Sequence, residues 1–158
     1  MSIPICVALL DAVQIVFLAL SPAPVNLGGL GTSIPTSSLG SFTHVFLGNE
    51  FIGTQELIPF YSVFAFARSL YLLVPSLTLL GVTWHATRAE VILRLFSFAY
   101  SWIEVSAYSY SVIKSFDFVV QILKRRTLTA KAVIRVWTLV TIALGAAACL
   151  EVMAMNVL

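Results

Sequence analysis

The sequence predicts an all-α fold, a polytopic transmembrane helical bundle of about five spans with a basic interfacial helix before the last span. Its composition predicts burial in a membrane, because apolar residues make up 59% of the 158 residues and charged residues only 10%. Soluble domains carry about 25% charged residues. The mean hydropathy of +0.99 agrees with this interpretation. A helix needs about 20 apolar residues to cross a bilayer core, and five stretches meet or approach that length.

The five predicted spans form a single membrane domain over residues 1–158. They run over residues 3–20, 42–64, 69–84, 91–113 and 132–157. The first resembles a signal peptide but lacks a basic region before its apolar run, so we expect a retained helix. The second carries Glu50, Glu56 and Pro59, and the third is short. An alternative is therefore that these two stretches form a re-entrant hairpin instead of two full spans.

Two segments between the spans differ in charge. Residues 21–41 are rich in Gly, Pro and Ser and carry no charge, which predicts an outer loop. Residues 114–131 hold five of the nine Lys and Arg residues, and we expect a helical extension along the lipid headgroups there. The cations expected to contact anionic lipid are Lys124, Arg125, Arg126 and Lys131.

The same basic segment predicts the orientation of the chain in the cell membrane. Basic residues near the ends of spans favour the cytoplasmic side, so residues 114–131 are expected in the cytoplasm. Five spans then put the N-terminus in the cytoplasm. The C-terminus and the neutral loop over residues 21–41 are expected outside.

Several classes of protein are excluded by composition and motifs. The formal net charge of +2 is too small to predict nucleic acid as a partner. Cys6 and Cys149 lie in apolar stretches near opposite ends of the chain, which indicates buried apolar groups and no disulfide. The sequence contains no nucleophile elbow, phosphate loop or dinucleotide-binding fingerprint. We therefore expect no enzyme activity and no cofactor.

Ionisable residues inside the predicted spans are the candidate functional residues: Asp11, Glu56, Arg94, Glu104 and Glu151. Such side chains are costly in a bilayer and usually face protein or water. One interpretation is a hydrogen-bonded core that packs the helices together. The other is a proton or ion relay through Asp11, Glu56 and Glu104, as carboxyl groups provide in membrane pumps.

The spacing of polar and small residues predicts that the fourth and fifth spans pack together. Polar residues share one helical face of the fourth span, at Ser97, Ser101, Glu104, Tyr108 and Ser111. Small residues and one acid form a stripe on the fifth span, at Ala143, Ala147, Glu151 and Ala154. Small side chains let two helices approach closely, so we expect Glu104 and Glu151 to face inward between the two spans.

His44 and His85 are weak candidates for a metal or haem site. If the second and third spans form a hairpin, both imidazoles lie at the same face of the membrane, and neutral imidazole is a common ligand. No HxxxH or CxxC spacing accompanies them. We therefore expect two interfacial histidines and no bound metal.

The fourth span also carries a recognisable pattern. Residues 99–107 (AYSWIEVSA) resemble the Pro-His-Gly-x-x-Glu-x-x-Ala signature of the stage II sporulation protein M family, with Glu104 and Ala107 matching. Ala-Tyr-Ser stands where that signature has Pro-His-Gly. Residues 46–59 and residues 146–151 (AAACLE) are similar to the family's second span and closing helix, so the resemblance covers about residues 42–158. It implies a membrane-embedded, non-enzymatic partner of wall hydrolases in a complex that remodels the cell wall.

These features predict a non-enzymatic integral membrane protein, a structural or accessory subunit of a larger membrane complex. Its expected partners are other membrane subunits or further copies of itself, because short loops leave little surface for soluble partners. One alternative is a small transporter or channel that uses the mid-membrane carboxylates. A second alternative is an electron-transfer subunit with a metal or haem held by His44 and His85.

Overall fold

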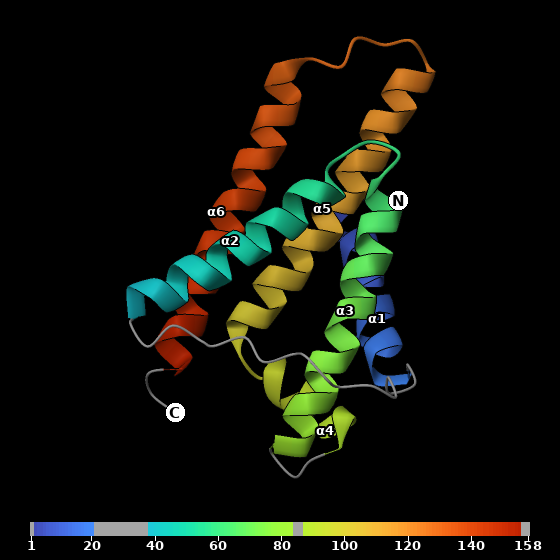
Figure 1. The fold of residues 1–158 in the computed structure, drawn as a ribbon. Coiled ribbons are helices and arrows are strands. Elements are labelled where there is room, and N and C mark those ends of the chain that lie inside the picture. The colour runs from blue at the N-terminus through green and yellow to red at the C-terminus, as the bar shows by residue number, and fades with distance from the viewer. Residues whose placement is uncertain (1, 21–37, 84–86, 156–158) are drawn as a thin grey trace.

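The computed structural model describes residues 2–20, 38–83 and 87–155, and within them it is entirely helical (Figure 1). The described residues contain six helices and no strand. Their bounds are α1 (Ile3–Leu20), α2 (Ser38–Glu56), α3 (Ser62–Thr83), α4 (Arg88–Leu95), α5 (Ala99–Leu123) and α6 (Ala130–Met155). The predicted all-α class is confirmed.

Helix α5 is the element around which the others pack. It lies beside α6, its most extensive neighbour, and it also contacts α1, α2 and α3. Figure 1 shows α5 and α6 as a long hairpin joined by a turn at one end, with α2 crossing both. One apolar cluster joins α2, α5 and α6 around Leu144, and a second joins α1, α3 and α4 around Val91.

Two of the six helices are long and apolar enough to cross a membrane. These are α1, over Ile3–Leu20 with hydropathy 2.4, and α6, over Ala130–Ala154 with hydropathy 2.0. Only 17% of the most apolar stretch of α1 and 28% of that of α6 are buried within the chain. The core helix of a soluble protein is mostly buried. The predicted count of five spans is not supported. In α5, for example, five serines and three tyrosines dilute the apolar residues.

The predicted boundary between the second and third spans is wrong. Helix α2 ends at Glu56 and α3 starts at Ser62, so the predicted break between residues 64 and 69 falls inside α3. Pro59 lacks a backbone N–H and cannot continue a helix. The next residue, Phe60, has a positive φ of 68°. The residues of this turn, 57–61 (LIPFY), are themselves apolar. Hydropathy alone therefore does not separate the turn from the helices on either side.

The predicted span over residues 91–113 is two helices, α4 and α5, with a break at residues 96–98. Side chains replace the missing helical partners of the carbonyl groups at the end of α4. Ser101 donates to the carbonyl of Leu95 at 2.8 Å, and the indole of Trp102 donates to that of Phe96 at 2.8 Å. The Leu95 carbonyl also accepts a hydrogen bond from the Phe98 backbone N–H at 3.1 Å, so the side-chain bonds add to the capping of this helix end.

A capping box begins α4. The Thr87 hydroxyl accepts a hydrogen bond from the Glu90 backbone N–H, and the Glu90 carboxylate accepts one from the Thr87 backbone N–H at 2.7 Å. Hydrogen bonds from the backbone and then the hydroxyl of Thr87 hold the pKa of the exposed Glu90 carboxyl below its usual value, and the charge of Arg94 adds to the effect. The short helix therefore starts at a position that its own sequence specifies.

The predicted basic interfacial helix over residues 114–131 does not exist as a separate element. Its first part is the end of α5, which continues to Leu123 because Phe118 packs into the core, 3% exposed. The remainder is a turn with a positive φ of 52° at Arg125, and α6 begins at Ala130. The predicted loop over residues 21–41 lies outside the described residues up to residue 37, and Ser38 already belongs to α2.

We expect Gly53→Ala to destabilise the bundle by about 1–3 kcal/mol relative to Gly48→Ala. A Cβ at Gly53 would lie 2.9 Å from Cδ1 of the fully buried Leu144 and 3.2 Å from Cγ1 of Val140, whereas one at Gly48 meets nothing within 4 Å. Both glycines lie in α2, so the gain in helix propensity cancels in the comparison. Thermal unfolding of the two variants in the same detergent measures the difference, and equal midpoints would contradict the packing.

Candidate functional site

The interior of the bundle is unusually polar. Eight polar or charged residues among those described are buried: Asp11, Gln14, Glu56, Ser62, Ser101, Ser109, Ser111 and Ser115. Buried polar groups in proteins are nearly always hydrogen-bonded. We therefore define the candidate site by the hydrogen bonds that these buried polar groups form between different helices.

A hydrogen-bonded cluster joins the middle of α1 to the middle of α5. The Asp11 carboxylate accepts hydrogen bonds from Ser109, at a short distance, and from Ser106 at 3.0 Å. The Gln14 amide donates to the hydroxyl of Ser109 at 2.7 Å. We call these four residues the α1–α5 polar cluster. Because Ser109 both donates to Asp11 and accepts from Gln14, it is the residue that completes the cluster.

A second polar group lies beside this cluster, on α5 itself. The Tyr108 hydroxyl donates to Glu104 at 3.0 Å. A cavity of about 110 Å³ is lined by Gln14 from the cluster together with Glu104 and Tyr108. The carboxyl of Glu151 on α6 is close enough to act electrostatically on Glu104. Glu104 and Glu151 are both half-buried.

Two acids of α2 face neighbouring helices. Glu56 is fully buried, and Ser69 of α3 donates to its Oε1 at 3.2 Å, while its Oε2 has no hydrogen-bond partner among the described residues. Glu50 accepts a hydrogen bond from Thr141 of α6 at 2.8 Å. These contacts hold α2 between α3 and α6, so both acids serve packing. The second carboxylate oxygen of each acid, Oε2 of Glu50 and Oε2 of Glu56, is buried without a hydrogen-bond partner among the described residues.

The structure brings four of the five candidate residues inward and leaves one outside. Asp11, Glu56, Glu104 and Glu151 come from α1, α2, α5 and α6 and are buried or half-buried. Arg94 is exposed on α4, and its charge acts on Glu90. On the predicted polar face of α5, the side chains of Ser101, Tyr108 and Ser111 are buried, whereas Ser97 lies in the exposed break between α4 and α5.

Three serines that complete the interior were not predicted as site residues: Ser106, Ser109 and Ser115. Ser115 donates to the carbonyl of Ile58 at 3.1 Å, which holds the turn between α2 and α3 against α5. The partners of these serines lie 57 to 98 residues away in sequence. Serine in an apolar helix was the available signal, but no spacing within one helix identifies a partner on another.

Part of the small-residue stripe of α6, at Ala147, packs inside the chain together with its neighbours Leu144 and Ala148. Ala147 is 1% exposed and Ala148 is not exposed, and Leu144 one turn earlier fills the space above Gly53 of α2. Of the stripe, Ala147 is therefore used for contacts inside the bundle, whereas Ala143, Glu151 and Ala154 are half-buried. Any partner in a membrane would meet the opposite, exposed side of α6.

The two histidines are not brought into a described metal centre. His44 is exposed on α2, and His85 lies outside the described residues. Within residues 2–20, 38–83 and 87–155, no group of three His, Cys, Asp or Glu side chains could hold a metal ion. Cys6 and Cys149 are both free thiols.

No protein-family model matches the chain, and neither a curated protein nor a solved structure matches it. The resemblance of residues 42–158 to the stage II sporulation protein M family stays a prediction. The function proposed below rests on the chain's own geometry.

We expect Ser109→Ala to lower the free energy of unfolding by about 1–3 kcal/mol, because it leaves a buried Gln14 donor and an Asp11 acceptor without a partner. Ser106→Ala is the matched control on the same helix, since it removes one hydrogen bond to the same carboxylate and is expected to cost about 1 kcal/mol. Unfolding in detergent measures both. A larger loss for Ser106→Ala would contradict the central place of Ser109 in the cluster.

Proposed function

We propose that this chain is a non-enzymatic integral membrane protein that works as a structural or accessory subunit of a larger membrane assembly. In this proposal α1 and α6 cross the bilayer in the same direction, and α5, which runs antiparallel to both, crosses back between them. The other helices complete the bundle around α5. The supporting observation is the distribution of polar and apolar side chains between the inside and the outside of the bundle.

The outer surface of α1 and α6 is apolar, whereas the interior of the bundle contains polar side chains. Ile5, Leu9, Val13 and Val16 of α1 each expose more than half of their surface. Ile142 and Met153 of α6 expose 64% and 65%. Burying one such side chain is worth about 1.5–3 kcal/mol, so a long row of them facing water would be strongly unfavourable. Lipid or an apolar partner satisfies this surface, which supports membrane burial of α1 and α6.

The arrangement of the helices also supports one orientation. Residues of α1 from Asp11 to Leu18 follow α5 from Ser109 back to Ser101, and α6 is the return arm of the α5–α6 hairpin. Both α1 and α6 therefore run antiparallel to α5, and their N-terminal ends point toward the same end of the bundle, although α1 starts further from that end than α6 does (Figure 1). The basic turn over residues 124–131 lies at that end, and basic residues favour the cytoplasm. We propose a cytoplasmic N-terminus and an external C-terminus.

The hydrogen bonds of the acids inside the bundle support a structural role. Asp11, Glu50 and Glu104 each accept at least one hydrogen bond from a hydroxyl group of the same chain. Hydrogen bonds of this kind join helices in membranes. Three buried polar atoms of α2 lack a hydrogen-bond partner among the described residues: Asn49 Nδ2, Glu50 Oε2 and Glu56 Oε2. The surface offered to a partner is mainly the exposed apolar faces of α1 and α6, which fits a subunit that packs beside other membrane helices.

Labelling of single cysteines tests the membrane burial of α6. Cys6 and Cys149 are replaced by Ser, and Ile142→Cys and Thr127→Cys are made separately, because both positions are exposed on the bundle itself. We expect a membrane-impermeant maleimide to modify position 127 in inside-out vesicles, and position 142 only after denaturation in SDS. Similar labelling of both in intact vesicles would contradict burial of α6, and labelling of position 127 only in right-side-out vesicles would contradict the orientation.

Native mass spectrometry tests the role as a subunit. The protein is extracted from its own membrane in mild detergent, and we expect other membrane proteins to travel with it in fixed stoichiometry, or further copies of the chain. A lone monomer would contradict the proposal. It would favour the alternative of a small transporter or channel, for which the unpartnered, fully buried Oε2 of Glu56 is the supporting observation.

A further inference from the structure

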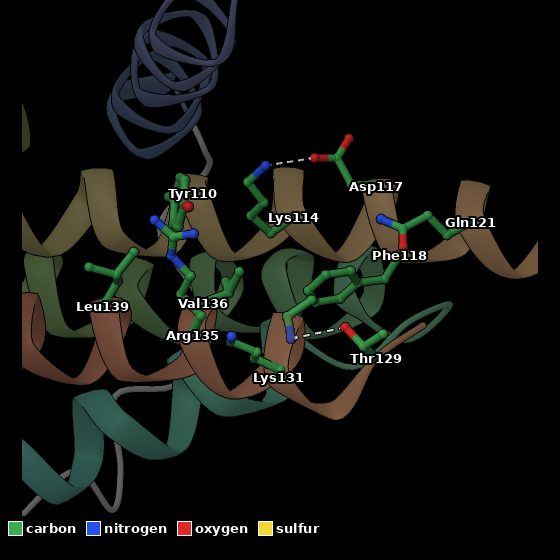
Figure 2. A pocket seen from close by; sticks show the side chains of 11 residues that line it. Tyr110, Lys114, Asp117, Phe118, Gln121, Thr129, Lys131, Arg135, Val136 and Leu139 are labelled. Atoms are coloured by element: carbon green, nitrogen blue, oxygen red, sulfur yellow. Dashed lines mark hydrogen bonds and ion pairs between the residues drawn. The ribbon is translucent and has the colours of Figure 1, made fainter. Parts of the chain in front are cut away.

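A basic cavity of about 500 Å³ opens between α5 and α6, close to the turn that joins them (Figure 2). Three cations line it: Lys114 from α5, and Lys131 and Arg135 from the first turns of α6. Asp117 is the only acid in its lining. It forms an ion pair with Lys114 at 2.8 Å. The cavity thus carries a formal excess of positive charge.

The excess is carried by Lys131 and Arg135. Among the described residues, neither of them lies within ion-pair distance of a carboxylate. Figure 2 shows the Arg135 guanidinium directed toward Tyr110, while Lys114 turns toward Asp117. Gln121 and Thr129 also line the cavity and add neutral polar groups. Guanidinium and ammonium donors together with neutral hydrogen-bonding groups are the chemistry that binds a phosphate group.

The basic cavity continues into an apolar groove. A second cavity of about 420 Å³ lies further along the contact between α5 and α6 and shares Tyr110 and Leu139 with the first. Its remaining lining is mostly apolar, including Trp102, Ile103 and Ala143. The two cavities thus lie next to each other along the contact between α5 and α6, the charged one nearest the turn and the apolar one beyond it, and we call the pair the α5–α6 depression. A small anion such as free phosphate would use only the charged end.

We propose that this depression binds one anionic phospholipid, with its phosphate between Lys131 and Arg135 and an acyl chain along the groove beside Leu139. The proposal rests on the proposed membrane location. In that location the cavity lies at the start of α6, at the level of the cytoplasmic headgroups, where lipid phosphates are found. It adds Arg135 and Lys114 to the predicted lipid contacts. It also separates the cations that line the cavity from those of the turn, Lys124, Arg125 and Arg126, which do not line it.

Native mass spectrometry of the full chain in detergent tests the site with defined lipids. Phosphatidylglycerol and phosphatidylcholine with the same acyl chains are titrated in turn, and we expect at least about tenfold tighter binding of the anionic lipid. Arg135→Gln is expected to remove most of this preference. Arg126→Gln is the matched control, because it removes the same charge from the same end of the bundle but from outside the cavity, and it is expected to keep the preference.

Inorganic phosphate and glycerol 3-phosphate distinguish a lipid from a free phosphate. We expect neither to displace phosphatidylglycerol at equal concentration, because they lack the acyl chain. Displacement as effective as that by the lipid itself would overturn the lipid assignment in favour of a soluble phosphate ligand. Equal loss of preference in Arg126→Gln and Arg135→Gln would overturn the site in the cavity. The binding is measured in detergent, so these failures are distinct from failure of the cysteine labelling that tests membrane burial.

Discussion

The need to pair polar groups inside the bundle is the constraint on which the rest of the structure depends, and α5 meets it. Its serines bond three other parts of the chain in turn. Ser106 and Ser109 hold Asp11 of α1, Ser115 holds the turn between α2 and α3 at Ile58, and Ser101 holds the end of α4 at Leu95. A buried carboxylate without partners costs several kcal/mol, on the order of the stability of a small domain. The position of α1 along α5 is therefore specified by a few hydroxyl groups.

This arrangement turns the polar groups of the helices inward and leaves apolar side chains on the outside. Packing in a membrane gains little from apolar contacts between helices, because lipid is equally apolar, and it depends on close approach and on hydrogen bonds. Gly53 against Leu144 supplies the close approach, and the α1–α5 polar cluster supplies the hydrogen bonds. The polarity changes at the turn between α5 and α6, where cations gather and the proposed lipid site begins. The interior and this turn therefore serve different purposes, one joining helices and the other meeting the headgroup layer.

Prediction from hydropathy succeeded where helix limits coincide with changes in composition. The first helix runs over the predicted residues 3–20, because a strongly apolar sequence with Asp11 as its one charged residue gives way there to the Gly- and Pro-rich segment. It failed where a turn is itself apolar. The turn around Pro59 and the break at residues 96–98 lie inside largely apolar stretches, so hydropathy does not separate them from the helices on either side. Pro59 marks the first of them, and the side-chain cap of Trp102 marks the second. The inward direction of Glu104 and Glu151 was predicted because both lie on recognisable helix faces.

The sequence by itself determined the helical class, the two most apolar helices and the identity of the acids that must be shielded. These are properties of single segments, since periodicity and composition act within about 20 residues. Only the tertiary structure decided that Asp11 meets Ser109, that Glu50 meets Thr141, and that Arg135 joins Lys114 in one cavity. The first two pairs are separated by 98 and 91 residues. Which helices become neighbours, and at what height, depends on the packing of all six together, and no local pattern carries that information.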